Sequence, residues 1–457
     1  MNIIICGAGK VGFSISKQLS AQGHAVTVID QSKDDIKKIN ETQDVKGIVG
    51  RATLPSVLEN AGAEKTDMII AVTRNDETNM IICQLASSLF NISKKIARIR
   101  SKEFLEGKWS KLYNKSNIPI DVIISPEIEV AKSLFRRLEA PGALDSVPFA
   151  NGKVKMLEIS VEKNCPVINT ALKNLTEKFP NFKAKILGAV RKEKFIFLKK
   201  NDKMTEGDKV YLVVSSDQLN EILKAFGHDE KTAEKILIIG GGNIGLNLAK
   251  LVESNFKGAR VKIIEKNKSR AEEIANELES SIVINGDALD EEILKEAKIE
   301  ESETVLALTN DDENNIMACV LAEKTAPNKR TIAIVNKSNY SLLQSSLNID
   351  DLVDPRMTTV SRIMEHVHKG TIGTVYSLLD GEYEFIEAEI QEKSELLNKK
   401  IKDSDLPEHI RIGAIVRKKE VIIPRSSSVF EKEDVVVFLA KRENLKEVES
   451  IFAVSSI

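Results

Sequence analysis

Three glycines near the start of the chain have a spacing that suits phosphate binding. Gly7, Gly9 and Gly12 form the pattern Gly-x-Gly-x-x-Gly, with Ala8, Lys10 and Val11 between them. The first glycine permits a tight turn from strand to helix, the second lets the backbone approach a pyrophosphate, and the third lets the helix pack on the strand. A helix that begins here directs free N–H groups and the positive end of its dipole at the phosphates. Residues 7–12, the first glycine loop, are therefore predicted to bind phosphate groups.

An acidic residue follows this loop at a useful distance. Asp30 lies 18 positions beyond Gly12 (30 minus 12) and ends an apolar, strand-like stretch at residues 25–29. A carboxylate at this place accepts hydrogen bonds from ribose hydroxyls, and it would repel a 2′-phosphate. We therefore expect NAD(H) or an adenine nucleotide rather than NADP(H). The alternative is a Rossmann-like fold whose pocket is empty.

The same arrangement returns in the second half of the chain, 233 residues later (240 minus 7). An apolar stretch precedes it, and Glu265 stands where Asp30 stood in the first half. We expect this second glycine loop, residues 240–245, to bind a nucleotide as well. Its candidate residues are Gly240, Gly241, Gly242, Asn243, Ile244 and Glu265.

A polar run follows the fourth predicted strand of each half. Thr73 and Arg74 open the first run, and Thr309 opens the second at a shift of 236 (309 minus 73). Doubly wound sheets bind ligands at the carboxyl ends of their strands. The near-repetition therefore favours a shared ligand role over the alternative, a plain helix cap.

The two halves differ in charge beside these sites. Arg98 ends the fifth predicted strand and could hold a phosphate through two N–H groups, whereas its counterpart is Ile334. Arg51 likewise has Asp287 as its counterpart. A highly charged nucleotide such as ATP is therefore expected to favour the first half, and NAD(H) to be better tolerated in the second.

Strand-like and helix-like segments alternate around both glycine loops, which is typical of a parallel sheet with crossover helices. After each such region the pattern changes to short strands with turns, which indicates a small α+β module. The sequence therefore predicts an α/β protein built as a tandem duplication: large, small, large, small. The expected boundaries are 1–125 (first Rossmann-like domain), 126–143 (helix and linker), 144–228 (first small domain), 233–355 (second Rossmann-like domain), 356–370 (helix and linker) and 371–455 (second small domain).

Composition excludes several classes of partner. The 66 basic and 68 acidic residues leave a net charge of -2, and aromatic residues make up only 5%. No basic excess or stacking surface therefore points to nucleic acid. No apolar stretch approaches the ~18 residues of a membrane span. The five histidines form no recognisable acid–base pair with a counterpart in both halves, so we expect a protein that is not an enzyme.

These features resemble those of a known family. The duplicated Rossmann-like and small domains, with Val-Thr-x-x-Asp-Glu-x-Asn after the fourth strand, are similar to the tandem RCK-domain regulatory subunits of Trk-type potassium uptake systems. In that family each RCK domain has an N-lobe and a C-lobe, which correspond to the large and small domains predicted above.

The resemblance implies a cytoplasmic protein, peripheral on the inner face of the cell membrane. Its N-lobes would bind NAD(H) or ATP/ADP, its lobes would assemble as a homo-oligomeric gating ring, and its partner would be a membrane-embedded potassium transporter subunit. By position, the first site would comprise residues 7–11 with Asp30, Thr73, Arg74 and Arg98, and the second residues 240–244 with Glu265 and Thr309. Two alternatives stay open: an NAD-dependent oxidoreductase, and an RCK-type regulator of another cation channel or antiporter.

Asp30 gives a direct test of cofactor choice. Because its carboxylate would repel a 2′-phosphate, we expect the first half to bind NADH more tightly than NADPH. The substitution Asp30→Ala should weaken NADH binding and reduce the difference in affinity between NADH and NADPH. Calorimetric titration measures both affinities. Equal affinities of the unaltered protein for both cofactors would contradict this prediction.

Overall fold

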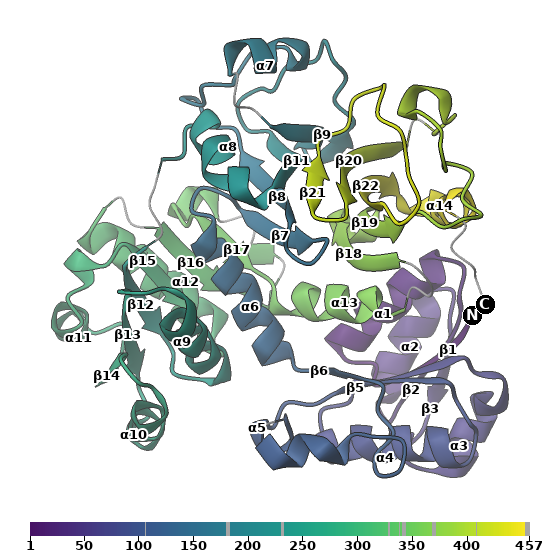
Figure 1. Cartoon of the computed structure of the whole chain (residues 1–457). Helices are drawn as coiled ribbons and strands as arrows, with labels where there is room; N and C mark the ends of the chain where they lie inside the picture. The colour runs from purple at the N-terminus through teal and green to yellow at the C-terminus, as the bar shows by residue number, and fades with distance from the viewer. Residues whose placement is uncertain are drawn as a thin grey trace. The chain divides into compact units, whose positions relative to one another are not determined.

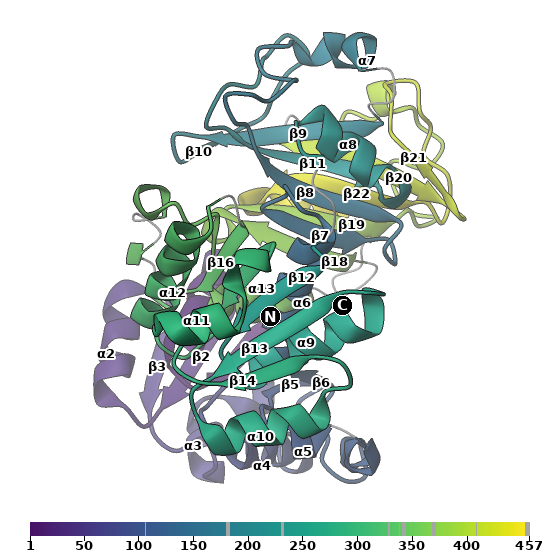
Figure 2. The ribbon, with the colours of Figure 1, turned by 90° about the vertical axis from the view of Figure 1, so that its left-hand side faces the viewer.

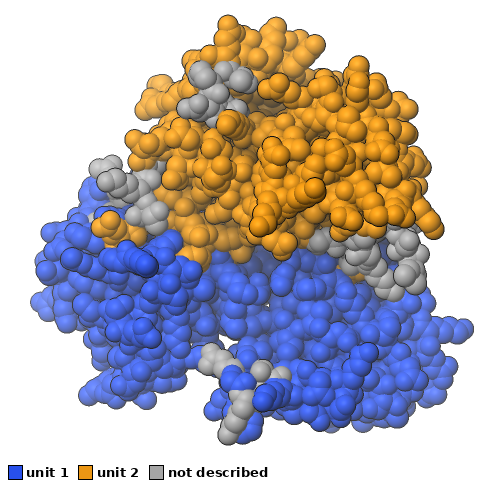
Figure 3. Space-filling model, in the orientation of Figure 1, with its two compact units in different colours: residues 1–132, 235–366 blue, residues 133–234, 367–457 orange. Residues whose placement is uncertain are grey.

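The computed structural model describes residues 1–105, 107–179, 183–229, 233–327, 330–337, 339–340, 344–367, 372–407 and 409–452. The expected limits near residue 370 and at residue 455 fall within 368–371 and 453–455, which lie outside the described residues. The limits of the six expected segments stay a prediction. The described chain divides into two compact units, residues 1–132 with 235–366 and residues 133–234 with 367–457 (Figure 3).

The first parallel sheet grows from short runs of isoleucine and valine. The central strand β1 is buried over four of its five residues, as expected for a strand that helices cover on both faces. The strand order β3-β2-β1-β4-β5-β6 is the classical Rossmann order. Figure 1 labels β1, β2, β3, β5 and β6 of this sheet. The strands are β1 (Asn2–Cys6), β2 (Ala25–Asp30), β3 (Lys46–Val49), β4 (Met68–Ala71), β5 (Lys94–Arg98) and β6 (Val122–Ile124), and the helices are α1 (Lys10–Ala21), α2 (Lys33–Thr42), α3 (Pro55–Asn60), α4 (Asp76–Ser88), α5 (Lys102–Leu105) and α6 (Pro126–Glu139).

The second parallel sheet repeats this order as β14-β13-β12-β15-β16-β17. Figure 2 shows β13 and β14 side by side, and their register pairs Glu265 with Asn285. The strands are β12 (Lys235–Ile239), β13 (Arg260–Glu265), β14 (Ile282–Asn285), β15 (Thr304–Ala307), β16 (Arg330–Ile334) and β17 (Asp351–Val353), and the helices are α9 (Asn243–Asn255), α10 (Lys268–Glu277), α11 (Glu291–Glu296), α12 (Asp312–Thr325) and α13 (Pro355–Glu365).

The two Rossmann-like lobes meet within the first unit. Helix α13 of the second lobe packs against α1 of the first, which begins at the first glycine loop. Lys102 of the first lobe also forms an ion pair with Glu277 of the second, which Lys250 contacts at 2.6 Å. The helix that follows the first glycine loop is therefore in direct contact with the neighbouring lobe.

Two antiparallel sheets form the second unit, with orders β10-β9-β11-β8-β7 and β18-β19-β22-β20-β21. Together with the parallel sheets they confirm the predicted fold class. The first comprises β7 (Asp145–Phe149), β8 (Val154–Ser160), β9 (Ala184–Arg191), β10 (Lys194–Ile196) and β11 (Lys209–Ser215) with α7 (Leu175–Lys178) and α8 (Leu219–Ala225); the second comprises β18 (Ile372–Leu378), β19 (Tyr383–Glu389), β20 (Ile410–Arg417), β21 (Glu420–Ile422) and β22 (Val435–Lys441) with α14 (Leu445–Ile451).

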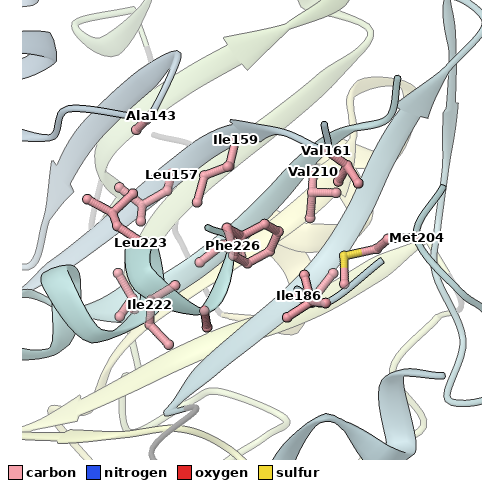
Figure 4. Packing of buried hydrophobic residues seen from close by; sticks show 14 of the residues in the cluster. Ala143, Leu157, Ile159, Val161, Ile186, Met204, Val210, Ile222, Leu223 and Phe226 are labelled. Atoms are coloured by element: carbon pink, nitrogen blue, oxygen red, sulfur yellow. The ribbon is translucent and has the colours of Figure 1, made fainter. Parts of the chain in front are cut away.

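Each antiparallel sheet has a core on both faces. On one face of the first sheet, Leu157 and Val210 pack against Ile222 and Phe226 from the region of α8 (Figure 4). The other face joins the second sheet in a shared core that includes Phe149 and residues of both small lobes. The sheets approach so closely that a Cβ added at Gly413 would lie 2.7 Å from Val213 Cγ2.

Phe385 lies at the centre of this shared core. It is fully buried, and its ring centroid is 6.4 Å from that of Phe149. Replacement by alanine removes buried apolar surface and leaves a cavity, so we expect Phe385→Ala to lower the free energy of unfolding by about 3–5 kcal/mol. Denaturant titration of the whole chain measures this change.

The matched control is Lys393→Ala, at an exposed position of the same lobe. We expect it to change the free energy of unfolding by less than about 0.5 kcal/mol. Equal effects of the two substitutions would show that the shared core does not stabilise the protein.

Candidate functional site

The first glycine loop joins β1 to α1 at the carboxyl edge of the first sheet. Gly7 has a φ of +117°, and a Cβ added at Gly12 would lie 1.8 Å from Gly7 O. Both positions therefore require glycine for the turn itself. Gly9 differs, because a Cβ there would meet no atom within 4 Å. The open space at Gly9, beside the start of α1, is where a phosphate group can approach the backbone.

Asp30 fastens this loop to the end of β2. Its Oδ2 accepts a hydrogen bond from Ala8 N at 2.6 Å, and its Oδ1 accepts one from Ser32 N at 2.9 Å. Each carboxylate oxygen can accept more than one hydrogen bond. Asp30 is thus placed at the loop with capacity for ribose hydroxyls. Lys10 is exposed and Val11 half-buried in the first turn of α1.

The second glycine loop has the same construction. Glu265 Oε2 accepts a hydrogen bond from Gly241 N, and its Oε1 accepts one from Asn267 N, each at 2.8 Å. Gly242 precedes α9, and a Cβ there would again meet no atom within 4 Å. Asn243 is exposed and Ile244 half-buried in the first turn.

A pocket of about 280 Å³ opens beside the second loop. Glycines and polar residues, among them Glu265, line one part of the pocket. Apolar side chains line the remainder. The lining residues are Ile239, Gly240, Gly242, Ile264, Glu265, Lys266, Gly286, Asp287, Ala288, Leu289, Leu308, Thr309, Asn310, Asp311, Asn314 and Ala318. The pocket therefore lies between the second glycine loop and the ends of β13, β14 and β15.

The polar runs after β4 and β15 stabilise the ends of the strands through side-chain hydrogen bonds. Asn79 Oδ1 accepts hydrogen bonds from Thr73 N at 3.0 Å and Thr73 Oγ1 at 2.7 Å, while its Nδ2 donates to Arg98 O at 2.8 Å. Asn315 makes the equivalent three contacts, with Thr309 and with Ile334 O. Each asparagine therefore ties the ends of two adjacent strands together.

An aspartate in each polar run accepts further hydrogen bonds from the backbone that follows the neighbouring strand. Asp76 is 8% exposed, and its Oδ2 accepts hydrogen bonds from Arg100 N at 2.8 Å and Ser101 N at 2.7 Å. Asp312 accepts hydrogen bonds from the backbone of Asn336 and Lys337 in the same way. Asp76 and Asn79 recur as Asp312 and Asn315 in the second half, so the sequence motif after the fourth strand already contains both residues.

The two candidate arginines of the first site lie differently. Arg74 is exposed beside Thr73. Arg98 is 8% exposed and donates through Nη2 to Thr73 O. Burial, and then the charge of Arg100, lowers the pKa of Arg98 to about 10, so the guanidinium stays protonated at pH 7. Arg98 therefore supports the Thr73 loop, and a contact with phosphate stays a prediction.

The described parts of the chain lack both a metal-binding cluster and a membrane-spanning helix. They contain no cluster of three or more histidine, cysteine, aspartate or glutamate residues that could hold a metal ion. Among the same residues, every helix falls short of the length and apolar character that crossing a bilayer requires.

The open space at Gly9 and Gly242 allows each site to be blocked separately. Aspartate is favoured at a helix N-cap, so Gly9→Asp and Gly242→Asp should fold normally while placing a carboxylate where phosphate binds. We expect each to weaken ADP binding at its own site at least tenfold, a loss of about 1.4 kcal/mol. Calorimetric titration measures the affinities, and thermal melting checks the fold.

The control for this pair is Gly12→Ala, whose Cβ collides with the backbone of Gly7. It should lower stability, unlike the two aspartate variants. Unaltered ADP affinity in the doubly substituted protein would contradict the assignment of the glycine loops as phosphate sites.

Comparison with known families accounts for almost the whole chain. The model of the TrkA-N domain matches residues 3–126 and 236–355, and that of the TrkA-C domain matches residues 156–227 and 385–453. In solved structures, the chain is similar to the crystal structure of the GsuK RCK domain, with a TM-score of 0.60, 18% identity and coverage of 99% of this chain and 95% of the other. It is also similar to the GsuK channel bound to NAD, with a TM-score of 0.60, 17% identity and coverage of 99% and 79%.

Curated relatives match over their full length. The Trk system potassium uptake protein TrkA of Azorhizobium caulinodans is 43% identical over 455 residues, covering 100% of this chain and 99% of the relative. The protein of the same name from Vibrio alginolyticus is 37% identical over 456 residues, covering 99% and 98%. Because both Rossmann-like lobes match the family model and the relatives align from end to end, the chain belongs to the TrkA family of Trk system potassium uptake proteins.

Proposed function

We propose that this chain is the nucleotide-binding regulatory subunit of a membrane potassium uptake transporter of the Trk type. The observation that carries the proposal is the pair of glycine loops, each with a carboxylate fastened to it, within a chain whose relatives are Trk system potassium uptake proteins. The ligands we propose are NAD(H) and ATP or ADP. The solved structure of the GsuK channel bound to NAD has a similar fold, which supports this class of ligand.

The chemistry of the second pocket favours binding over hydride transfer. An oxidoreductase needs an acid–base group whose pKa lies near the working pH. Lys266 is the candidate base in the lining, and its Nζ lies 2.8 Å from Asp287 Oδ2. This hydrogen bond raises the pKa of Lys266 above its ordinary value, which disfavours the neutral amine. Lys266 is therefore disfavoured as the general base that an NAD-dependent oxidoreductase would need at this pocket.

A nucleotide regulates only if it binds two conformations with different affinity. The first glycine loop leads directly into α1, and α1 packs against α13 of the second lobe. A phosphate at Gly9 therefore acts on a helix that forms the contact between lobes. We propose that this contact converts nucleotide binding into a change in lobe arrangement, with a coupling of roughly 1–3 kcal/mol.

Assembly of several copies into a ring has a candidate surface on the Rossmann-like lobes. Ile81 on α4 is 49% exposed, and Met317, its counterpart on α12, is 51% exposed. The two repeats thus leave an apolar side chain exposed at the same helix position. We propose that neighbouring copies meet at these helices, on the cytoplasmic face of the membrane beside the transporter.

Transport assays with the purified Trk-type membrane subunit of the same organism test the proposal. We expect the unaltered chain to bind that subunit and to make potassium uptake into proteoliposomes depend on ATP, ADP or NADH. The doubly blocked variant Gly9→Asp/Gly242→Asp should still bind the membrane subunit, because its substitutions lie in the nucleotide loops. Its uptake should no longer respond to nucleotide.

Two outcomes would contradict the proposal. Turnover of NADH with a carbonyl substrate, lost in the blocked variant, would identify an oxidoreductase. Isolation of the chain from cells with a different channel or antiporter, together with uptake that ignores the chain, would identify a regulator of another transport system.

A further inference from the structure

We propose that Arg270 is the phosphate-binding cation of the second nucleotide site, for the polyphosphate chain of a nucleotide or dinucleotide. This inference rests on the proposed function, since it assigns a role within that site. Arg270 was not among the residues expected from the sequence, because it lies on α10 rather than on the glycine loop or a strand end.

The side chain of Arg270 lies directly on the second glycine loop. Its Nε donates to Gly241 O at 2.9 Å, and its Nη2 donates to Asn243 Oδ1 at 3.2 Å. Its own backbone N donates to Asn267 Oδ1 at 3.0 Å, which caps α10 and fixes the position of the residue. The guanidinium is therefore held beside the start of α9, next to Gly242 of the pocket lining rather than within the lining itself.

The guanidinium retains capacity for a phosphate. Arginine has five N–H donors in a planar fork, and Gly241, Asn243 and Glu273 occupy three of them. Glu273 pairs with Nη1 at 2.7 Å, and its side chain is 59% exposed. An exposed ion pair of this kind is weak, so a phosphate can compete with Glu273 for the guanidinium.

Comparison of the repeats shows an exchange of charge between two positions. Lys10 and Asn243 are the first residues of the equivalent helices α1 and α9. Asp35 and Arg270 are the third residues of the equivalent helices α2 and α10, and the backbone N of each donates to the residue that caps its helix. The first repeat thus carries its cation on the glycine loop, and the second carries it on the neighbouring helix.

This exchange changes what the two sites offer a phosphate chain. Ile334 stands where the first half has Arg98, so the end of β16 offers no cation to the second site. Lys266 in the pocket lining and Arg270 on α10 are cations beside the second loop, whereas Arg98 of the first lobe is buried against Thr73 O. Polyphosphate binding at the second site should therefore depend on Arg270 rather than on the end of β16.

Calorimetric titration of the full chain with ADP, ATP and adenosine tests this role. Every protein tested carries Gly9→Asp, which blocks the first site, so that the measured affinities belong to the second site. We expect Arg270→Ala to weaken ADP and ATP binding by about tenfold to a hundredfold, because a charge-assisted contact is lost. Adenosine, which lacks phosphate, should bind as before. Arg270→Lys should give an intermediate loss, because it keeps the charge without the fork.

Two further variants sharpen the test. Lys268→Ala removes an exposed charge from the first turn of the same helix and should leave all three affinities unchanged. Glu273→Ala removes the competing carboxylate and should raise ADP affinity.

The contrary results are distinct. Equal weakening of adenosine and ATP by Arg270→Ala would show that Arg270 only supports the loop, and an unaltered ATP affinity would also overturn its assignment. Absence of any nucleotide binding in the protein that carries Gly9→Asp alone would instead overturn the second nucleotide site itself, and with it the role of Arg270.

Discussion

The carboxyl edge of each parallel sheet depends on one buried asparagine. Asn79 and Asn315 are each fully buried and hydrogen-bond to the ends of two neighbouring strands at once. Strand ends leave backbone groups without partners, and burying such groups is costly unless a side chain satisfies them. The asparagine meets this need and thereby fixes the loop that faces the glycine turn. The pocket beside the second glycine loop is therefore formed by strand ends that side-chain hydrogen bonds hold in place.

The duplication retains the rigid edge and changes the charges around it. The asparagine, the aspartate beside it and the carboxylate on the glycine loop are the same in kind in both lobes, with Asp30 in one and Glu265 in the other. Side chains that do not support the loop differ more, as at Lys10 and Asn243. The two lobes therefore share a framework but present different charges beside their glycine loops.

Much of the fold could be predicted from the sequence because both repeats carry strong periodic patterns and a glycine loop. Strand β7 was missed, since Pro148 interrupts its pattern and proline is tolerated only where a strand lies at a sheet edge. The second apolar face of the small sheets was also missed, because short strands do not reveal what covers them. In the site, the residues next to the glycines were predicted from spacing. Asp76 and Asn79 recur in both halves and so stand out in the sequence, whereas the contact of Arg270 with the glycine loop joins elements that spacing does not relate.

The shared core of the two antiparallel sheets has a consequence for assembly. Phe149 and Phe385 come from different halves of one covalent chain, so their contact forms within a single molecule. Its strength does not vary with dilution, unlike an interface between separate subunits, because the linked halves keep a fixed effective concentration. The pairing of small lobes is therefore complete in the monomer. Only contacts between whole chains remain sensitive to how much of the protein a cell makes.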